Sequence, residues 1–172
     1  MAKSFQLKAR GVQDLINIYG ALTPKEIATI KQDEAVKSIS RVQRIFEELE
    51  KANDTFVKLS EKYNEPLLKL QQEYQEKIQN FRADSKLEEK EKEKEINKLV
   101  VEANSKIQKI TKEQEKKLNY EKAGEAMVTV TINSDERFKL FQDIFEKVAA
   151  EKFLNKKALC DCWEAIEAAK EV

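Results

Sequence analysis

The feature that most constrains this chain is a long run of apolar residues spaced alternately three and four positions apart. The run continues without a slip through Ile39, Val42, Phe46, Leu49, Asn53, Phe56, Ser60, Tyr63, Leu67, Leu70 and Tyr74. All but two of these residues are apolar or aromatic, and this spacing is typical of a helix that packs along a second helix in a coiled coil. Pro66 lies inside the run but does not shift its frame, which favours a kinked helix over two separate ones.

Capping motifs predict where this helix and the next one begin. The segment from Thr23 to Glu26 forms a capping box with Pro24 at the first helical position, so we expect a helix from Pro24 to Phe81. A second capping box, from Ser85 to Glu88, predicts a second helix that ends near Lys122, before Gly124.

Apolar residues recur along this second helix with a rhythm of about eleven residues per three turns. They are Ile96, Leu99, Ala103, Ile107 and Ile110. The short turn near residues 82–85 makes the two helices an antiparallel hairpin.

The two ends of the chain have strand patterns. Residues 4–9 alternate between polar and apolar, and residues 126–132 are rich in β-branched side chains. We expect these strands to pair and the helices near both termini to cover them. The aromatic residues of the terminal helices either form the core of this head or dock a partner; they are Phe138, Phe141, Phe145 and Trp163.

The predicted fold class is therefore mainly α. A small α+β head is built from residues 1–23 and 123–172, with two short strands and the terminal helices. Residues 24–122 form the antiparallel coiled-coil hairpin. Two polar residues interrupt the predicted seam, Asn53 and Ser60. A buried Asn at such a position fixes register or strand number, and the alternative is local solvation near Pro66.

Composition restricts the chemistry. The chain of 172 residues has 32 Lys and Arg against 32 Asp and Glu, no His and three Gly. Without histidine there is no Ser-His-Asp triad and no histidine metal ligand, and three separated glycines cannot form a phosphate-binding loop. Cys160 and Cys162 alone provide too few zinc ligands. We expect no catalytic residue, no metal, no cofactor and no enzymatic activity.

Charge and hydropathy also bear on partners and location. The balanced charge gives no signal for nucleic acid or an anionic membrane. No apolar stretch approaches the ~18 residues of a membrane span, and the N-terminus lacks the apolar core of a signal peptide. We expect a location in the host cytoplasm or in a virion.

The layout resembles known phage proteins. A strand and helix from Phe5 to Tyr19 lead into a long charged helix ending in Glu61-Lys62-Tyr63, followed by a hairpin, a strand and terminal helices. This arrangement resembles small phage-encoded coiled-coil proteins of unknown function found near tail and structural genes. The segment from Leu154 to Leu159 is also similar to the C-terminal part of the phage Gam host-nuclease inhibitor, which joins a helical hairpin to a small head. This chain differs from Gam in having a strand and helix before the hairpin, and no functional residue carries over from either family.

These patterns predict a non-enzymatic coiled-coil interaction protein that serves as a structural or assembly component, and the resemblance implies that it is phage or prophage encoded. Its partner is a second copy in a dimer or higher oligomer, or another virion or host protein. One alternative is an inhibitor that occludes a host nuclease or defence protein. A second alternative is a prefoldin-like chaperone, although prefoldin rods carry their strands at the middle of the hairpin.

Overall fold

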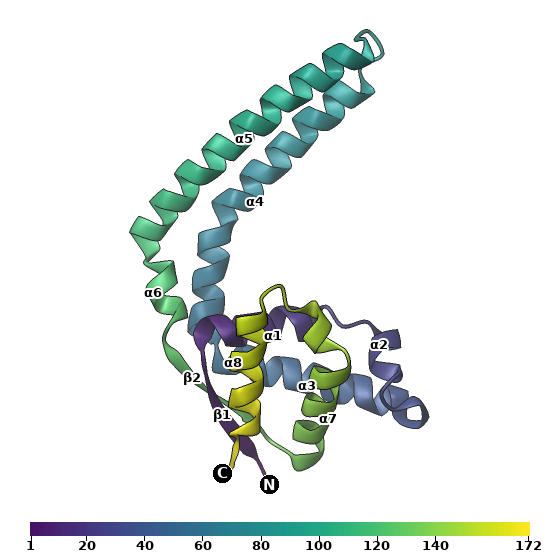
Figure 1. Ribbon diagram of the computed structural model, residues 1–172, viewed down its shortest axis with the longest axis vertical. Helices are drawn as coiled ribbons and strands as arrows, with labels where there is room; N and C mark the ends of the chain where they lie inside the picture. The colour runs from purple at the N-terminus through teal and green to yellow at the C-terminus, as the bar shows by residue number, and fades with distance from the viewer. The chain divides into compact units, whose positions relative to one another are not determined.

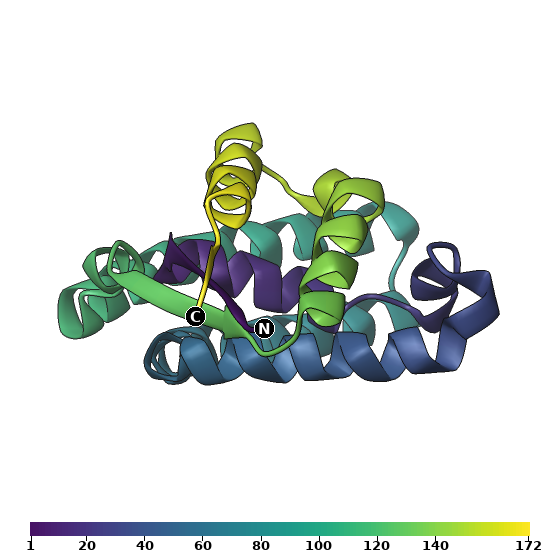
Figure 2. The same cartoon turned by 90° about the horizontal axis from the view of Figure 1, so that it is seen from below.

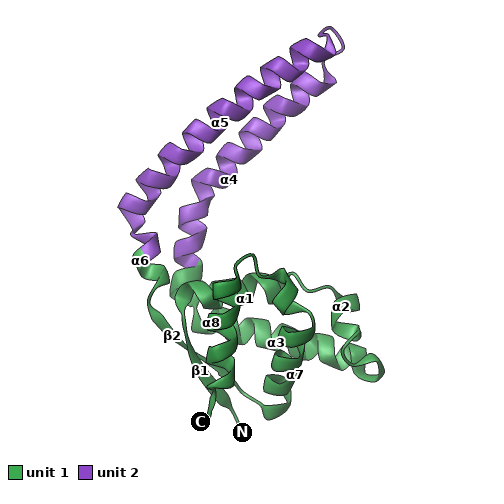
Figure 3. Cartoon of the chain, in the orientation of Figure 1, with its two compact units in different colours: residues 1–57, 122–172 green, residues 58–121 purple.

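A computed structural model describes all residues, 1–172, as two compact units. One unit, the head, combines residues 1–57 with residues 122–172, and the other, the hairpin, contains residues 58–121 (Figure 3). The chain is mainly helical with a small antiparallel sheet, which confirms the predicted fold class.

The helices and strands follow one another along the chain as labelled in Figure 1. They are β1 (Lys3–Lys8), α1 (Ala9–Gly20), α2 (Pro24–Ala28), a 3-10 helix (Gln32–Glu34), α3 (Ala35–Ala52), α4 (Asp54–Ala83), α5 (Glu89–Leu118), α6 (Tyr120–Gly124), β2 (Met127–Ile132), α7 (Asp135–Lys147), a second 3-10 helix (Ala149–Lys152), α8 (Lys156–Glu167) and β3 (Lys170–Glu171).

The sheet of the head has the strand order β2-β1-β3. β1 pairs with β2 in antiparallel register along its whole length, with Phe5 opposite Val130 and Leu7 opposite Val128. The predicted pairing of the two terminal strands is therefore confirmed. β3 was not predicted: it adds two residues at the start of β1, and both chain ends lie at this side of the sheet (Figure 2).

One face of the sheet is buried against helices α1, α3, α7 and α8. Phe5 stacks on Phe141 with ring centroids 5.8 Å apart, and the Tyr19 hydroxyl donates a hydrogen bond of 2.7 Å to the Phe141 backbone oxygen. Phe138, Phe141 and Phe145 are all buried, and Trp163 is half-buried with its ring stacked on Phe145. These aromatic side chains therefore build the core of the head.

The predicted continuous helix from Pro24 to Phe81 is wrong. The capping box at Thr23 is present, but α2 ends after five residues, and the chain passes through a 3-10 helix before α3 begins. A further break at Asn53 separates α3 from α4, whereas α4 continues through Pro66.

Burial explains why α3 departs from the coiled-coil pattern. Val42, Ile45 and Leu49 lie in the core of the head, and Ile45 is fully buried although it is outside the heptad frame. Asn53 is buried at the α3–α4 junction, where its Nδ2 atom donates a hydrogen bond of 3.0 Å to the backbone oxygen of Ala9. The hairpin unit therefore begins at residue 58 rather than at residue 24.

Substitution of Ile45 tests whether α3 belongs to the core of the head. We expect Ile45→Ala to lower the free energy of unfolding by about 2–4 kcal/mol, because it leaves a cavity in a closed core. Denaturant unfolding monitored by Trp163, the only tryptophan of the chain, reports on the head. The control on the same helix is Val36→Ala, at a side chain that is 83% exposed, and it should change stability by less than about 0.5 kcal/mol. Equal effects of the two variants would contradict this packing.

Candidate protein-interaction surface

The hairpin is formed by the part of α4 from residue 58 onward and by α5, which lie side by side and run in opposite directions (Figure 1). The predicted capping box at Ser85 does not form. Instead the Asp84 side chain accepts a hydrogen bond of 2.8 Å from the Lys86 backbone N–H, and α5 begins at Glu89 without a side-chain cap. The Asp84 side chain therefore stabilises the turn between the helices, and the start of α5 has no side-chain cap.

The predicted seam residues are divided between the two units. Ile39, Val42, Phe46, Leu49, Asn53 and Phe56 lie in the head, whereas Ser60, Tyr63, Leu67, Leu70 and Tyr74 lie in the hairpin. Within the hairpin Ser60, Leu70 and Tyr74 are buried, and Tyr63 and Leu67 are half-buried. The residues of the heptad frame are therefore buried or half-buried, and the frame does not distinguish the two packing environments.

The partners on α5 are less well covered. None of its 30 residues is buried. Ile96, Leu99, Ala103 and Ile110 are half-buried, and Ile107 is 37% exposed. Helix α4 therefore covers only part of the apolar stripe of α5.

Val100 extends this uncovered stripe. It is 42% exposed and lies seven residues before Ile107, so both side chains are on one face of the helix. Two further apolar residues of the hairpin, Leu68 on α4 and Val101 on α5, are also exposed. The hairpin thus presents apolar surface beyond what its own two helices bury.

A polar and aromatic cluster joins the open ends of the two helices. The hydroxyl groups of Ser60 and Tyr120 lie 3.0 Å apart and share a hydrogen bond, and the Tyr120 ring stacks on Tyr63 with centroids 4.2 Å apart. Tyr120 reaches this position because Asn119 adopts a left-handed conformation, with φ of 52°, and ends α5. Ser60 is therefore a hydrogen-bonded position in the seam, and the sequence predicted neither its partner nor the break at Asn119.

Several charged side chains of the hairpin form ion pairs within one helix. Glu65 with Lys69, Glu73 with Lys77, and Glu102 with Lys106 form ion pairs four residues apart, at 2.7, 2.6 and 3.0 Å. The hydrogen bond from Lys69 lowers the pKa of Glu65, and that from Lys77 lowers the pKa of Glu73. Such exposed pairs contribute little individually to stability, so they indicate a solvated outer surface.

The two cysteines have different environments. Cys160 is exposed, whereas Cys162 is buried and its thiol donates a hydrogen bond of 3.8 Å to the Gly11 backbone oxygen. Burial raises the pKa of the Cys162 thiol to about 12, and the charges of Asp14 and Asp161 act in the same direction. The two thiols therefore differ in their exposure to solvent.

Two further structural findings concern ions and membranes. No three His, Cys, Asp or Glu side chains are grouped so that they could hold a metal ion. No helix has both the length and the apolar character that crossing a bilayer requires.

Comparisons with known proteins identify no relative. No protein-family model, no curated protein and no solved structure matches the chain.

Thiol reactivity tests the environments of the two cysteines. At neutral pH we expect Cys160 to react rapidly with a disulfide reagent, while Cys162 reacts only after denaturation, because the thiolate is the nucleophile and the raised pKa keeps Cys162 protonated. Cys160→Ser should remove the fast phase measured by absorbance, and Cys162→Ser should leave it unchanged. A fast phase that survives Cys160→Ser would contradict this assignment.

Proposed function

We propose that this protein is a non-enzymatic coiled-coil interaction protein that acts as a structural or assembly component through helix–helix packing. The observation that carries the proposal is the incompletely covered apolar stripe of α5, a helix of 30 residues in which no residue is buried. The partner proposed for this surface is the hairpin of a second copy, which would give a four-helix arrangement.

The energetic argument is the burial of apolar area. A Val or Ile side chain that becomes fully buried gains roughly 1.5–3 kcal/mol relative to an exposed one. Val100 and Ile107 are 42% and 37% exposed, so part of this gain is available to them, and the half-buried Ile96, Leu99 and Ile110 would add to it. Two helices bury only one face of each other, whereas four helices enclose a core. Association of two hairpins would therefore bury the apolar area that one hairpin leaves exposed.

The proposed origin, a phage or prophage, is supported by the resemblance to small phage-encoded coiled-coil proteins. In that setting the structural role predicts that the protein is present in purified particles at a fixed stoichiometry, which quantitative mass spectrometry measures. Absence from the particles together with loss of a host nuclease activity on binding would instead favour the inhibitor.

Charge substitutions on the uncovered stripe test the association. We expect the wild-type chain to form dimers or higher oligomers at micromolar concentration, and Val100→Glu with Ile107→Glu to be monomeric, since association would bury two carboxylates. Sedimentation equilibrium over a range of concentrations measures the change, and circular dichroism checks that the helices are retained.

The matched control adds the same charge elsewhere on α5. Ser105 and Gln108 are exposed and lie away from the stripe of Val100 and Ile107, on the side of α5 that carries Val101, so Ser105→Glu with Gln108→Glu should associate like the wild type. A wild-type chain that stays monomeric at all concentrations would refute the proposed self-association.

A further inference from the structure

The sheet of the head has an edge that β3 covers only in part. β3 pairs with Lys3 and Ser4, and no strand lies beside β1 beyond that point on this side. β3 does not extend further along β1, because α8 continues to Glu167 and leaves only a few residues before β3 begins at Lys170. β1 therefore continues past the end of its shorter neighbour.

Two backbone hydrogen bonds establish which groups of β1 point to the uncovered side. The N–H of Ala9 donates to the Ala126 oxygen at 2.8 Å, toward β2, and the N–H of Val172 donates to the Ala2 oxygen at 3.1 Å, on the β3 side. Because backbone groups alternate along a strand, even-numbered residues of β1 direct their N–H and C=O groups to the β3 side. Gln6 and the N–H of Lys8 therefore form an open backbone edge.

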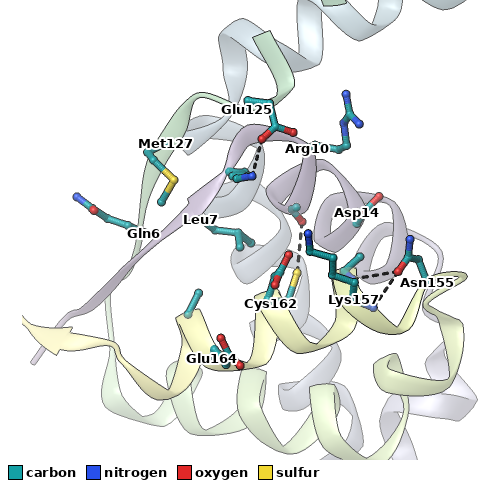
Figure 4. Close-up of a pocket in the computed structure, with 15 residues that line it drawn as sticks. Gln6, Leu7, Arg10, Asp14, Glu125, Met127, Asn155, Lys157, Cys162 and Glu164 are labelled. Atoms are coloured by element: carbon teal, nitrogen blue, oxygen red, sulfur yellow. Dashed lines mark hydrogen bonds and ion pairs between the residues drawn. The ribbon is translucent and has the colours of Figure 1, made fainter. Parts of the chain in front are cut away.

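Residues of this edge line a cavity of about 630 Å³, together with Glu125 and Met127 from the β2 side of β1. Gln6, Leu7 and Lys8 line one side of the cavity, and α8 lines the other from Lys157 to Ala165 (Figure 4). We call this space the strand–helix groove. Its size is within the range of about 300–1,000 Å³ that is usual for ligand sites.

The N-terminus of α8 does not make the groove an anion site. The Asn155 side chain caps this helix and accepts hydrogen bonds from the backbone N–H groups of Lys157 and Ala158, at 2.8 and 3.4 Å. These two amides are therefore already used. The available backbone groups of the groove are those of β1.

The side chains around the groove are more acidic than basic. Four carboxylates line it, from Asp14, Glu125, Asp161 and Glu164, against three cationic groups, from Lys8, Arg10 and Lys157. Glu125 is paired with Lys8. On the α8 wall the two carboxylates of Asp161 and Glu164 outnumber the single cationic group of Lys157, so this wall favours a ligand with basic side chains.

We infer that the strand–helix groove binds an extended, basic peptide segment of a partner protein, which adds as a strand to the open edge of β1 and places its basic side chains near Asp161 and Glu164. Strand addition uses backbone hydrogen bonds for affinity and side-chain contacts for specificity, and the groove supplies both. This site lies wholly in the head and does not depend on the association of the hairpin.

The backbone part of the inference is tested in the free protein by NMR hydrogen exchange. The amides of Gln6 and Lys8 should exchange faster than those of Phe5 and Leu7, which face β2. Equal protection of all four amides would show that the edge is already covered and would overturn the inference.

Binding is tested with the capped peptide acetyl-Val-Lys-Val-Lys-Val-amide and the full-length chain. We expect saturable shifts of the Gln6 and Lys8 amides, with a Kd of about 0.1–1 mM, and slower exchange of both amides. The control peptide acetyl-Val-Lys-Pro-Lys-Val-amide has the same charge but lacks a central N–H, and it should bind about tenfold more weakly or not at all. No saturable shift, or equal binding of the two peptides, would overturn strand addition.

Two sets of variants separate the contribution of backbone hydrogen bonds to peptide binding from the contribution of charge. Gln6→Pro removes the N–H on the open side without removing a bond to β2, so binding should weaken about tenfold, whereas Gln6→Ala should bind like the wild type. Asp161→Lys with Glu164→Lys changes only exposed positions of α8, and it should reject the lysine peptide and bind acetyl-Val-Glu-Val-Glu-Val-amide instead. Unchanged preference after this charge reversal would contradict the proposed basic ligand.

Discussion

In the head, the ladder between β1 and β2 joins residues from opposite ends of the sequence, with Lys3 opposite Ile132 and Lys8 opposite Met127. Closing so long a loop is entropically costly, and a locally formed hairpin reduces that cost because it shortens the chain that remains flexible. The contacts of Tyr120 with Ser60 and Tyr63 hold the two ends of the hairpin together. In sequence, the hairpin adjoins the residues of the head directly, at positions 57/58 and 121/122. The rest of the head depends on this ladder, since its buried face carries Phe5 and Leu7 into the core.

Local patterns predicted local structure well. The predicted capping box at Thr23 forms and the β-branched segment 126–132 contains β2, whereas the predicted capping box at Ser85 does not form. These motifs act within one turn or one strand, so their outcome depends little on the rest of the chain. The two-residue strand β3 is too short to leave a periodic pattern.

The heptad frame shows where sequence periodicity fails. It marks a buried helical face correctly, but the same spacing serves Leu49 in the mixed core of the head and Leu70 in the hairpin. Ile45 is fully buried outside the frame because strands and several helices surround α3, which widens its buried face beyond a single seam. The sequence pattern does not predict the helix break at Asn53 either, because the hydrogen bond from the Asn53 side chain to Ala9 joins residues far apart in the sequence. The sequence alone does not predict either candidate surface in full. The exposed area of each surface depends on how much of it a neighbouring helix or strand covers.

The two candidate surfaces differ in the chemistry they offer. The hairpin offers side chains of α5 that α4 leaves uncovered, which suits another helix. The strand–helix groove offers backbone groups of β1, which suit only a chain in extended conformation. The extent of that open edge is set by where α8 ends: a helix that stopped earlier would leave more residues to lengthen β3 along β1 toward Gln6. The helical segment through Glu167 therefore keeps the edge open as well as forming the opposite wall of the groove. Helix α8 thus combines two structural roles in one element, and the acidic residues that it carries lie where a basic strand would pass.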